Sequence, residues 1–284
     1  MREHTHSIRC GQTLLDLTSP LVMSILNITP DSFYSPSRTV NSSSVIVDRA
    51  GRMLEEGARI IDVGGMSSRP GAEEIEPQEE TDRVIPAVVA LKKAFPEAVI
   101  SVDTYRAFVA KQAIDAGATM INDISGGSLD PDMIDVIDAR KAAYVLMHMR
   151  EKPSDMQSHT NYEDLTRDIV KYFVNKLRTL RQKGILNIII DPGFGFSKTV
   201  DQNFQIIRQL NIFSFLECPV LIGLSRKSSL SQVIRRPVEA TLDATTALHM
   251  IALEHGASIL RVHDVKAAID AIAVFNKLHE PKIH

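Results

Sequence analysis

The chain has 284 residues, of which 44% are hydrophobic, and its formal net charge is −3. This composition is sufficient for a sizeable globular core, and it lacks the general basic surface that nucleic-acid binding requires. Aromatic residues make up only 5% of the chain and Trp is missing, so aliphatic side chains are expected to fill the core, which favours α/β layers over an aromatic-rich β-sandwich.

Targeting segments and cysteine pairs are not evident in the sequence. No apolar run approaches the 18 or more residues of a membrane span, and the start of the chain lacks the apolar region of a secretory signal. Cys10 and Cys218 are far apart and do not have metal-ligand spacing. We therefore expect a cytoplasmic protein that has neither nucleic acid nor membrane as its partner.

The first predicted element is a short hairpin. Residues 7–17, SIRCGQTLLDL, precede the first apolar strand and contain a central Gly. We assign residues 1–20 to a hairpin that caps the bottom of a barrel and residues 21–284 to the barrel itself, with the two counted as a single domain overall.

A local pattern then recurs along the chain, in which a polar helical segment ends at Gly-Ala and a short apolar strand follows. It occurs at 55–65, 115–127 and 254–264. Glycine adopts the left-handed cap that stops a helix, and continuous β-branched runs are typical of parallel strands buried on both faces. The predicted strands are 21–27, 59–63, 98–103, 119–123, 143–148, 187–191, 219–223 and 258–262. Helical stretches between them include 77–94, 105–116, 161–183 and 238–255.

Eight strands alternating with helices predict an α/β fold of the (β/α)8 TIM-barrel class, with a short N-terminal β-hairpin. The alternative is an open doubly wound sheet. Its glycine-rich dinucleotide fingerprint is missing after the first strand.

Polar side chains collect where these strands end, which is the end at which barrel enzymes carry their active sites. Each of them alone has a structural explanation, such as a turn or a solvated helix start, but their coincidence at one barrel mouth favours a binding site. These residues are Asn27, Asp62, Asp103, Asn122, Asp123, His148, Asp191, Arg261 and His263. Long polar loops at 28–42 and 64–76 follow the first two strands, as binding loops often do.

The residue types at this mouth suggest three kinds of ligand. Asp103 and Asp191, with Asn122 and Lys227, suit a flat heterocycle with adjacent N–H donors and an oxo acceptor. Asn27, with Arg261 and His263, suits a phosphate or pyrophosphate, together with Mg²⁺, which takes few protein ligands plus substrate oxygens. The helix start at 227–229 offers free backbone N–H groups for an anion.

The motifs resemble those of the dihydropteroate synthase family, a group of pterin-binding enzymes. They span nearly the whole chain and occur in the order found in the family. They are NITPDSF (27–33), GGMSSRPGA (64–72), SVDTYR (101–106), INDISGG (121–127), LMHM (146–149), DPGFGF (191–196), GLSRKS (223–228) and RVHD (261–264).

The resemblance implies a transferase that joins 6-hydroxymethyl-7,8-dihydropterin pyrophosphate to p-aminobenzoate, with sulfonamides as competitors, Mg²⁺ as cofactor and a homodimeric assembly. It implies catalytic roles for Asp103, Asp191, Lys227, Arg261 and His263. The implied pterin contacts are Asp103, Asn122, Met147, Asp191, Gly223 and Lys227. The implied pyrophosphate contacts are Asn27, Arg69, Arg261 and His263, with the metal at Asn27. The implied p-aminobenzoate contacts are Ser68, Arg69, Pro70, Phe196, Lys227 and Ser228, with Asp31 and Phe33 on a mobile loop.

The sequence departs from the family pattern at a few positions. Ser68 replaces the usual Thr, residues 34–37 lack the usual glycines, Ser197 stands where Gly or Ala is usual, and Arg150 stands where Gly is common. Three alternatives remain open: a methyltetrahydrofolate-dependent corrinoid methyltransferase module, a non-catalytic pterin-binding paralogue, and a Schiff-base aldolase that uses Lys227.

Overall fold

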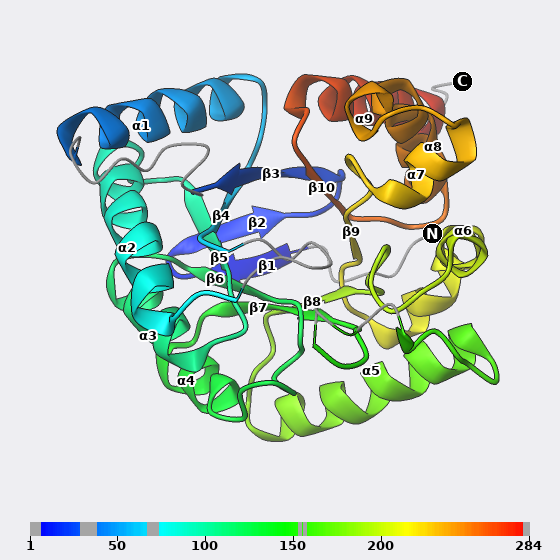
Figure 1. The fold of residues 1–284 in the computed structure, drawn as a ribbon, viewed down its shortest axis with the longest axis horizontal. Helices are drawn as coiled ribbons and strands as arrows, with labels where there is room; N and C mark the ends of the chain where they lie inside the picture. Colours follow the sequence, from blue (N-terminus) through cyan, green and yellow to red (C-terminus); the bar gives the residue numbers. More distant parts are fainter. Residues whose placement is uncertain (1–6, 29–38, 67–73, 153–154, 156–157, 281–284) are drawn as a thin grey trace.

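Eight parallel strands form one sheet that curls into a barrel in the computed structural model, which describes residues 7–28, 39–66, 74–152, 155 and 158–280 (Figure 1). The strand order is β8-β7-β6-β5-β4-β3-β10-β9. A bridge between Ile190 and Val220 joins the two outermost strands and closes the ring. The strands are β3 (Leu21–Asn27), β4 (Ile60–Gly64), β5 (Val99–Asp103), β6 (Met120–Asp123), β7 (Ala143–Met147), β8 (Ile188–Asp191), β9 (Leu221–Ile222) and β10 (Ile259–Val262).

Helices surround this sheet on its outer side (Figure 1), so the predicted (β/α)8 barrel is confirmed. The α-helices are α1 (Thr39–Glu55), α2 (Pro77–Ala94), α3 (Ala107–Asp115), α4 (Met133–Arg140), α5 (Leu165–Gln182), α6 (Val200–Arg208), α7 (Ser228–Ile234), α8 (Leu242–Glu254) and α9 (Val265–His279). The 3₁₀ segments η2 (Leu210–Leu216) and η3 (Val238–Ala240) precede β9 and α8. None of the helices that the structure describes is long and apolar enough to span a membrane.

The recurring Gly-Ala pattern has the predicted effect at the helix ends. Gly57 and Gly117 have φ values of +110° and +116°, a conformation that an L side chain rarely adopts. A Cβ atom on Gly117 would also lie 2.7 Å from Lys92 Cγ. Glycine therefore ends each helix and lets the chain turn directly into the next strand.

Three predicted elements differ from the structure. The expected helix 161–183 begins only at Leu165. Only Leu221–Ile222 of the expected strand 219–223 forms a ladder, because Pro219 has no N–H to donate, although its carbonyl accepts a 2.9 Å bond from the Ile190 N–H. The expected helix 238–255 begins as the 3₁₀ turn η3, and the α-helix starts only at Leu242.

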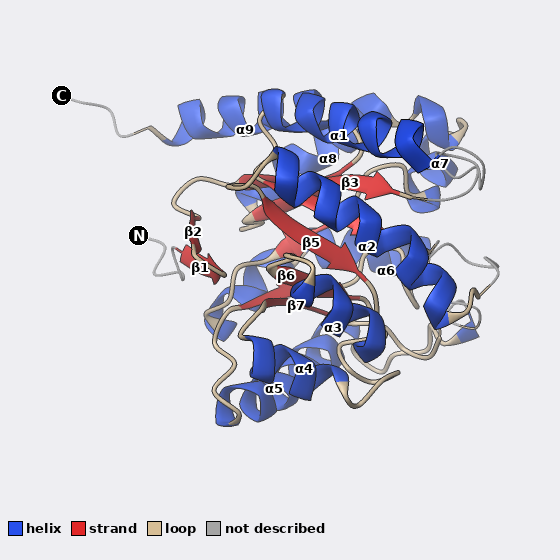
Figure 2. Ribbon diagram, turned by 90° about the vertical axis from the view of Figure 1, so that its left-hand side faces the viewer, coloured by secondary structure: helices blue, strands red, loops and turns tan. Residues whose placement is uncertain are grey.

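The hairpin of β1 (Ser7–Cys10) and β2 (Thr13–Asp16) lies at the end of the barrel from which the strands start (Figure 2). Its buried side chains Ile8, Cys10 and Leu15 pack against Met23 and other apolar residues of the barrel interior. Apolar packing therefore fills the bottom of the barrel, and the polar strand ends lie at the opposite end.

Candidate active site

Strand register brings the predicted polar residues to one level of the barrel. Asn27 and Asp103 both pair with Gly64, and Asp103 pairs in turn with Asn122. A Cβ atom at Gly64 would lie 3.2 Å from Asn27 Oδ1, so the glycine leaves room for the Asn27 amide at the rim. The carboxyl ends of β3 to β6 thus present one amide, one carboxylate and a second amide side by side.

A buried ion-pair network connects these strands across the barrel. Arg261 Nε donates to Asp62 Oδ2 over 2.7 Å, and Arg261 Nη2 donates to Asp103 Oδ2 over 2.6 Å. Asn122 Nδ2 donates to the same Asp62 oxygen over 2.9 Å. Asp62 is fully buried, and the sequence identified it only as a polar strand end with no role. Asp62 lies two residues before Gly64 in the same strand, so both residues are on the same face of the sheet. This spacing was the available signal that Asp62 lines the barrel interior.

Burial changes the protonation of the two carboxylates predicted to bind substrate. Desolvation raises the pKa of Asp103 to about 7, although Arg261 opposes this shift, and the nearby Asp62 adds to it. Desolvation also raises the pKa of Asp191, against a 2.7 Å bond from the Gly193 N–H to its Oδ1. In their ionised forms, both carboxylates can accept from ring N–H and amino donors.

An apolar wall covers one side of the polar floor of the site, which is formed by Asp103, Asn122 and Asp191. Phe196, Tyr105, Ile124, Met147 and Met149 form a buried cluster at the barrel mouth. Met147 pairs in register with the strand residue Asp191, so the wall adjoins the buried carboxylate.

Lys227 lies against this wall. Its Nζ is 4.2 Å from the centre of the Phe196 ring, a cation–π geometry. A Cβ at Gly195, whose φ is +86°, would lie 3.1 Å from Lys227 Cδ. Lys227 caps α7, which begins at Ser228 as predicted, so the lysine and the free N–H groups of this helix start are close together.

His263 is held by a residue that sequence reasoning missed. The His263 backbone N–H donates to Ser225 Oγ over 3.2 Å, and its ring Nδ1 lies 3.1 Å from the same oxygen. Ser225 belongs to the GLSRKS motif, which was the available signal. Gly223, two residues earlier, lies beside β10, since a Cβ there would be 3.9 Å from Arg261 Cβ.

Asn27 is the candidate metal ligand among the described residues, in which no group of three or more His, Cys, Asp and Glu side chains could hold a metal ion. Mg²⁺ often keeps several waters and takes one or two protein oxygens plus phosphate oxygens of the substrate. One amide oxygen at the rim, beside the expected pyrophosphate position, fits such an ion.

Five predicted site residues lie outside the described residues, so their placement stays a prediction. They are Asp31, Phe33, Ser68, Arg69 and Pro70. The remaining predicted residues gather at the mouth. Arg261, expected at the pyrophosphate, also forms ion pairs with Asp62 and Asp103, so it connects the pyrophosphate set with the pterin set.

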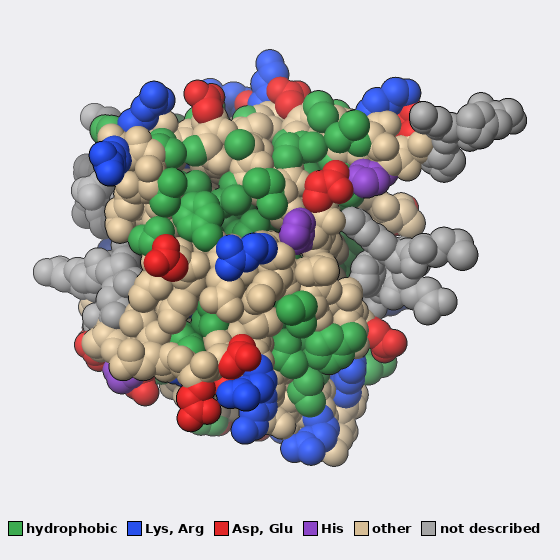
Figure 3. All heavy atoms as spheres, turned by 90° about the vertical axis from the view of Figure 1, so that its right-hand side faces the viewer, with side chains coloured by type: hydrophobic (Ala, Val, Ile, Leu, Met, Phe, Trp, Pro, Cys, Tyr) green, Lys and Arg blue, Asp and Glu red, His purple; other side chains and the backbone are tan. Residues whose placement is uncertain are grey.

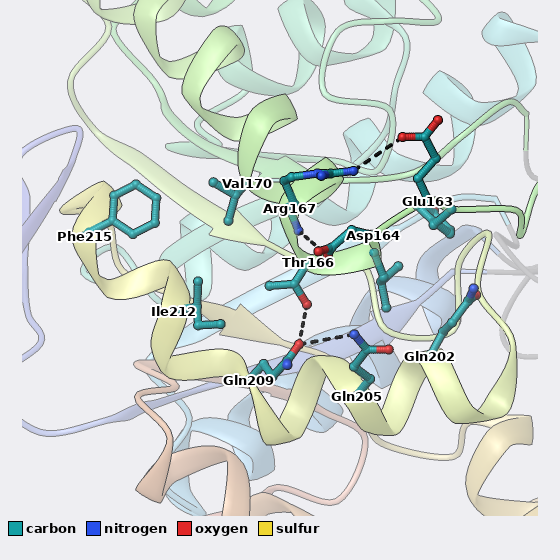
Figure 4. Close-up of a pocket in the computed structure, with 12 residues that line it drawn as sticks. Glu163, Asp164, Thr166, Arg167, Val170, Gln202, Gln205, Gln209, Ile212 and Phe215 are labelled. Carbon is teal, nitrogen blue, oxygen red and sulfur yellow. Dashed lines mark hydrogen bonds and ion pairs between the residues drawn. The ribbon is translucent and has the colours of Figure 1, made fainter.

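A separate surface cavity of about 590 Å³ lies between α5 and the α6–η2 segment, away from the strand ends (Figure 4). Its lining includes Thr166, which bonds to Gln209, and the half-exposed Phe215. It holds none of the residues predicted to carry chemistry.

A family model described as pterin binding enzyme matches residues 23–263, which defines the class to which this barrel and mouth belong. A dihydropteroate synthase from Synechocystis is 42% identical over 272 residues, covering 94% of this chain and 93% of the relative. The structure of the Yersinia pestis dihydropteroate synthase with a sulfonamide drug has a TM-score of 0.89 and 37% identity, covering 97% of this chain and all of that one.

A third similar protein is the Xanthomonas albilineans dihydropteroate synthase, solved in complex with 7,8-dihydropteroate, at a TM-score of 0.85 and 34% identity over 97% of this chain and 99% of that one. The chain therefore belongs to the dihydropteroate synthase family, whose members are transferases. This membership favours the synthase over the methyltransferase module, the non-catalytic paralogue and the aldolase.

Proposed function

We propose that the barrel mouth condenses 6-hydroxymethyl-7,8-dihydropterin pyrophosphate with p-aminobenzoate, giving 7,8-dihydropteroate and pyrophosphate. The observation that carries this proposal is a pair of carboxylates, the buried Asp191 and the mostly buried Asp103, which lie with Asn122 beneath a wall that includes Phe196. A flat ring with several N–H donors satisfies those carboxylates without leaving a buried acceptor unpaired.

The pterin occupies the polar floor in this proposal. Asp191 and Asp103 accept from ring and amino N–H groups, while Asn122 and Lys227 donate to ring acceptors. Met147 packs against the ring, and Gly223 leaves space for it. The anionic side chains also stabilise positive charge that develops on the pterin as its C–O bond to pyrophosphate breaks.

The leaving group lies toward the rim, at Asn27, Arg261 and His263. An aryl amine is neutral at pH 7 and needs no strong base, so the main barrier is cleavage of the C–O bond. Arg261 and His263 stabilise the charge that grows on the pyrophosphate. Mg²⁺ held near Asn27 would supply further Lewis-acid stabilisation of that charge. We propose a dissociative substitution on this basis, with no nucleophile from the enzyme.

The p-aminobenzoate site lies between the wall and α7. Phe196 offers a ring face, and the helix start at Ser228, next to Lys227, suits the carboxylate. Sulfonamides are expected to compete here, which is supported by the sulfonamide complex of the Yersinia relative. The loop residues Ser68, Arg69 and Pro70 are expected to close this side.

Assembly and location are also proposed. Exposed apolar side chains on α7 and α8, including Val233, Leu242 and Ile251, favour a homodimer through these helices. Figure 3 shows apolar side chains gathered on the face that carries them. Cys10 and Cys218 are buried free thiols, which favours a cytoplasmic location.

Positional isotope exchange tests the dissociative step. Pterin pyrophosphate labelled with ¹⁸O in the C–O–P bridge is incubated with the enzyme and Mg²⁺, with benzoate in place of p-aminobenzoate. Because the freed pyrophosphate rotates before the bond re-forms, we expect the label to move into non-bridging positions, measured by ³¹P NMR. A label that stays in the bridge would contradict the dissociative step. A covalent enzyme–pterin adduct in mass spectra would contradict the absence of an enzyme nucleophile.

A further inference from the structure

Two adjacent buried residues next to the wall have no role in the proposed reaction. Ser197 and Lys198 follow Phe196 in the loop between β8 and α6, and they are 0% and 3% exposed. A buried lysine needs an electrostatic reason for its position, and a left-handed serine needs a structural one.

Ser197 joins this loop to the loop that follows β7. Its φ is +50°, a left-handed conformation that a non-glycine residue rarely adopts. Its Oγ accepts from the Arg150 N–H over 3.0 Å and donates to the Arg150 carbonyl over 2.7 Å. The Ser197 carbonyl accepts from the Tyr162 hydroxyl over 3.0 Å. These three bonds hold the serine in its strained conformation.

The two bonded residues of the neighbouring loop also contact each other. The Arg150 guanidinium lies 3.7 Å from the centre of the Tyr162 ring, and its Nη1 donates to the Asn161 carbonyl over 2.6 Å. Arg150 and Ser197 are 47 residues apart, and both are positions at which the sequence departs from the usual pattern of the family. Since Ser197 bonds both polar backbone groups of Arg150, the two departures form one contact.

Lys198 acts as an internal cation inside the same loop. Its Nζ donates to the carbonyls of Phe196, Gly193 and His148 over 2.9, 3.0 and 3.4 Å, and lies 3.2 Å from His148 Nδ1. Burial lowers the lysine pKa to about 7 and keeps the His148 pKa well below its usual range. Three carbonyl dipoles around one ammonium group hold the loop backbone in place.

Phe196 is therefore held on its C-terminal side by Ser197 and Lys198. Its carbonyl bonds to Lys198, the next residue is clamped to Arg150, and its ring lies against Lys227. We propose that Ser197 and Lys198 are positioning residues that fix the Phe196 ring and so set the affinity for the aryl amine substrate. This inference rests on the proposed function, in which Phe196 contacts p-aminobenzoate.

The test separates aryl amine use from pterin binding. Ser197→Ala removes both bonds to Arg150, and Lys198→Met removes the cation while retaining most of the volume. A net loss of about 1 kcal/mol corresponds to about a 5-fold change. We expect the KM for p-aminobenzoate to rise about 5-fold in Ser197→Ala and about 10-fold or more in Lys198→Met. The Kd for a non-reactive pterin, measured by calorimetry, should stay within about 2-fold.

Thr199→Ala is the matched control. Thr199 forms the capping box of α6 with Gln202, so this variant should have a lower Tm without loosening Phe196, and its KM for p-aminobenzoate should not change. An unchanged KM in Ser197→Ala, with a loss of Tm like that of Thr199→Ala, would overturn the inference. A loss of pterin affinity as large as the rise in KM for p-aminobenzoate would also overturn the inference. If Lys198→Met does not fold, the result for Ser197→Ala alone decides the test. Failure of the wild-type chain to form dihydropteroate would instead count against the proposed function. In that case, calorimetric binding of p-aminobenzoate to the variants would still test whether Ser197 and Lys198 fix the Phe196 ring.

Discussion

Replacing Asp191 by Asn is expected to weaken pterin binding about 100-fold. The carboxylate lies buried at the end of β8, and a charged hydrogen bond in such a place is worth about 1.5–3 kcal/mol. Asn retains the volume and can still accept from the Gly193 N–H, which donates to Asp191 Oδ1, but its amide group would face the N–H donors of the ring. The measurement is calorimetry with a non-reactive pterin.

Asp201→Asn is the matched control for this result. Asp201 lies in the exposed first turn of α6, so the same chemical change there should leave the pterin Kd unchanged. A loss below about 3-fold in Asp191→Asn would mean that Asp191 supports the loop after β8 and does not bind the ring.

Arg261→Met is expected to lower the free energy of unfolding at pH 8 by about 3–5 kcal/mol, because it leaves Asp62 and Asp103 as uncompensated buried charges. The loss relative to the wild type should shrink as the pH falls from 8 to about 7, the pKa of Asp103 in the wild type, and stay level at lower pH. Burial already raises the Asp103 pKa and Arg261 opposes that shift, so removing the arginine raises this pKa further. A folded state with a raised carboxyl pKa binds protons more readily than the unfolded state, so the variant gains stability as the pH falls.

Urea unfolding at pH 8, 7, 6 and 5 measures this dependence, with Arg226→Met as the matched control. Arg226 pairs with Asp264 at the surface, where the two side chains are 43% and 29% exposed, so that variant should lose no more than about 1 kcal/mol. Equal losses in the two variants, or a loss that grows toward pH 5, would contradict the description of Arg261 as the centre of a buried ion-pair network.

The barrel was predictable because its strands depend on local patterns. Gly57 and Gly117 end helices, and the apolar run after each of them forms the next strand. The seventh strand is shorter than predicted, since Pro219 removes a ladder donor and only Leu221–Ile222 remain in regular pairing. Local residues indicate where a strand begins, whereas its length depends on the partners that it meets.

The site was predictable in part for the same reason. Strand-end residues such as Asp103, Asn122 and Asp191 follow directly from the strand assignments, and register then brings them together. Asp62 was assigned no role because its importance depends on Arg261, which is 199 residues away and joins it only when the barrel closes. Ser197 was seen only as a departure from a family pattern, because its partner Arg150 lies in another loop.

The most direct test of the central claim is product formation by the purified chain. The protein is incubated with 6-hydroxymethyl-7,8-dihydropterin pyrophosphate, p-aminobenzoate and Mg²⁺, and dihydropteroate and pyrophosphate are quantified by chromatography and a coupled phosphate assay. We expect equal amounts of the two products, a rate suppressed by a sulfonamide in competition with p-aminobenzoate, and a strongly reduced rate in Asp191→Asn. The absence of dihydropteroate from the folded wild-type protein would contradict this function.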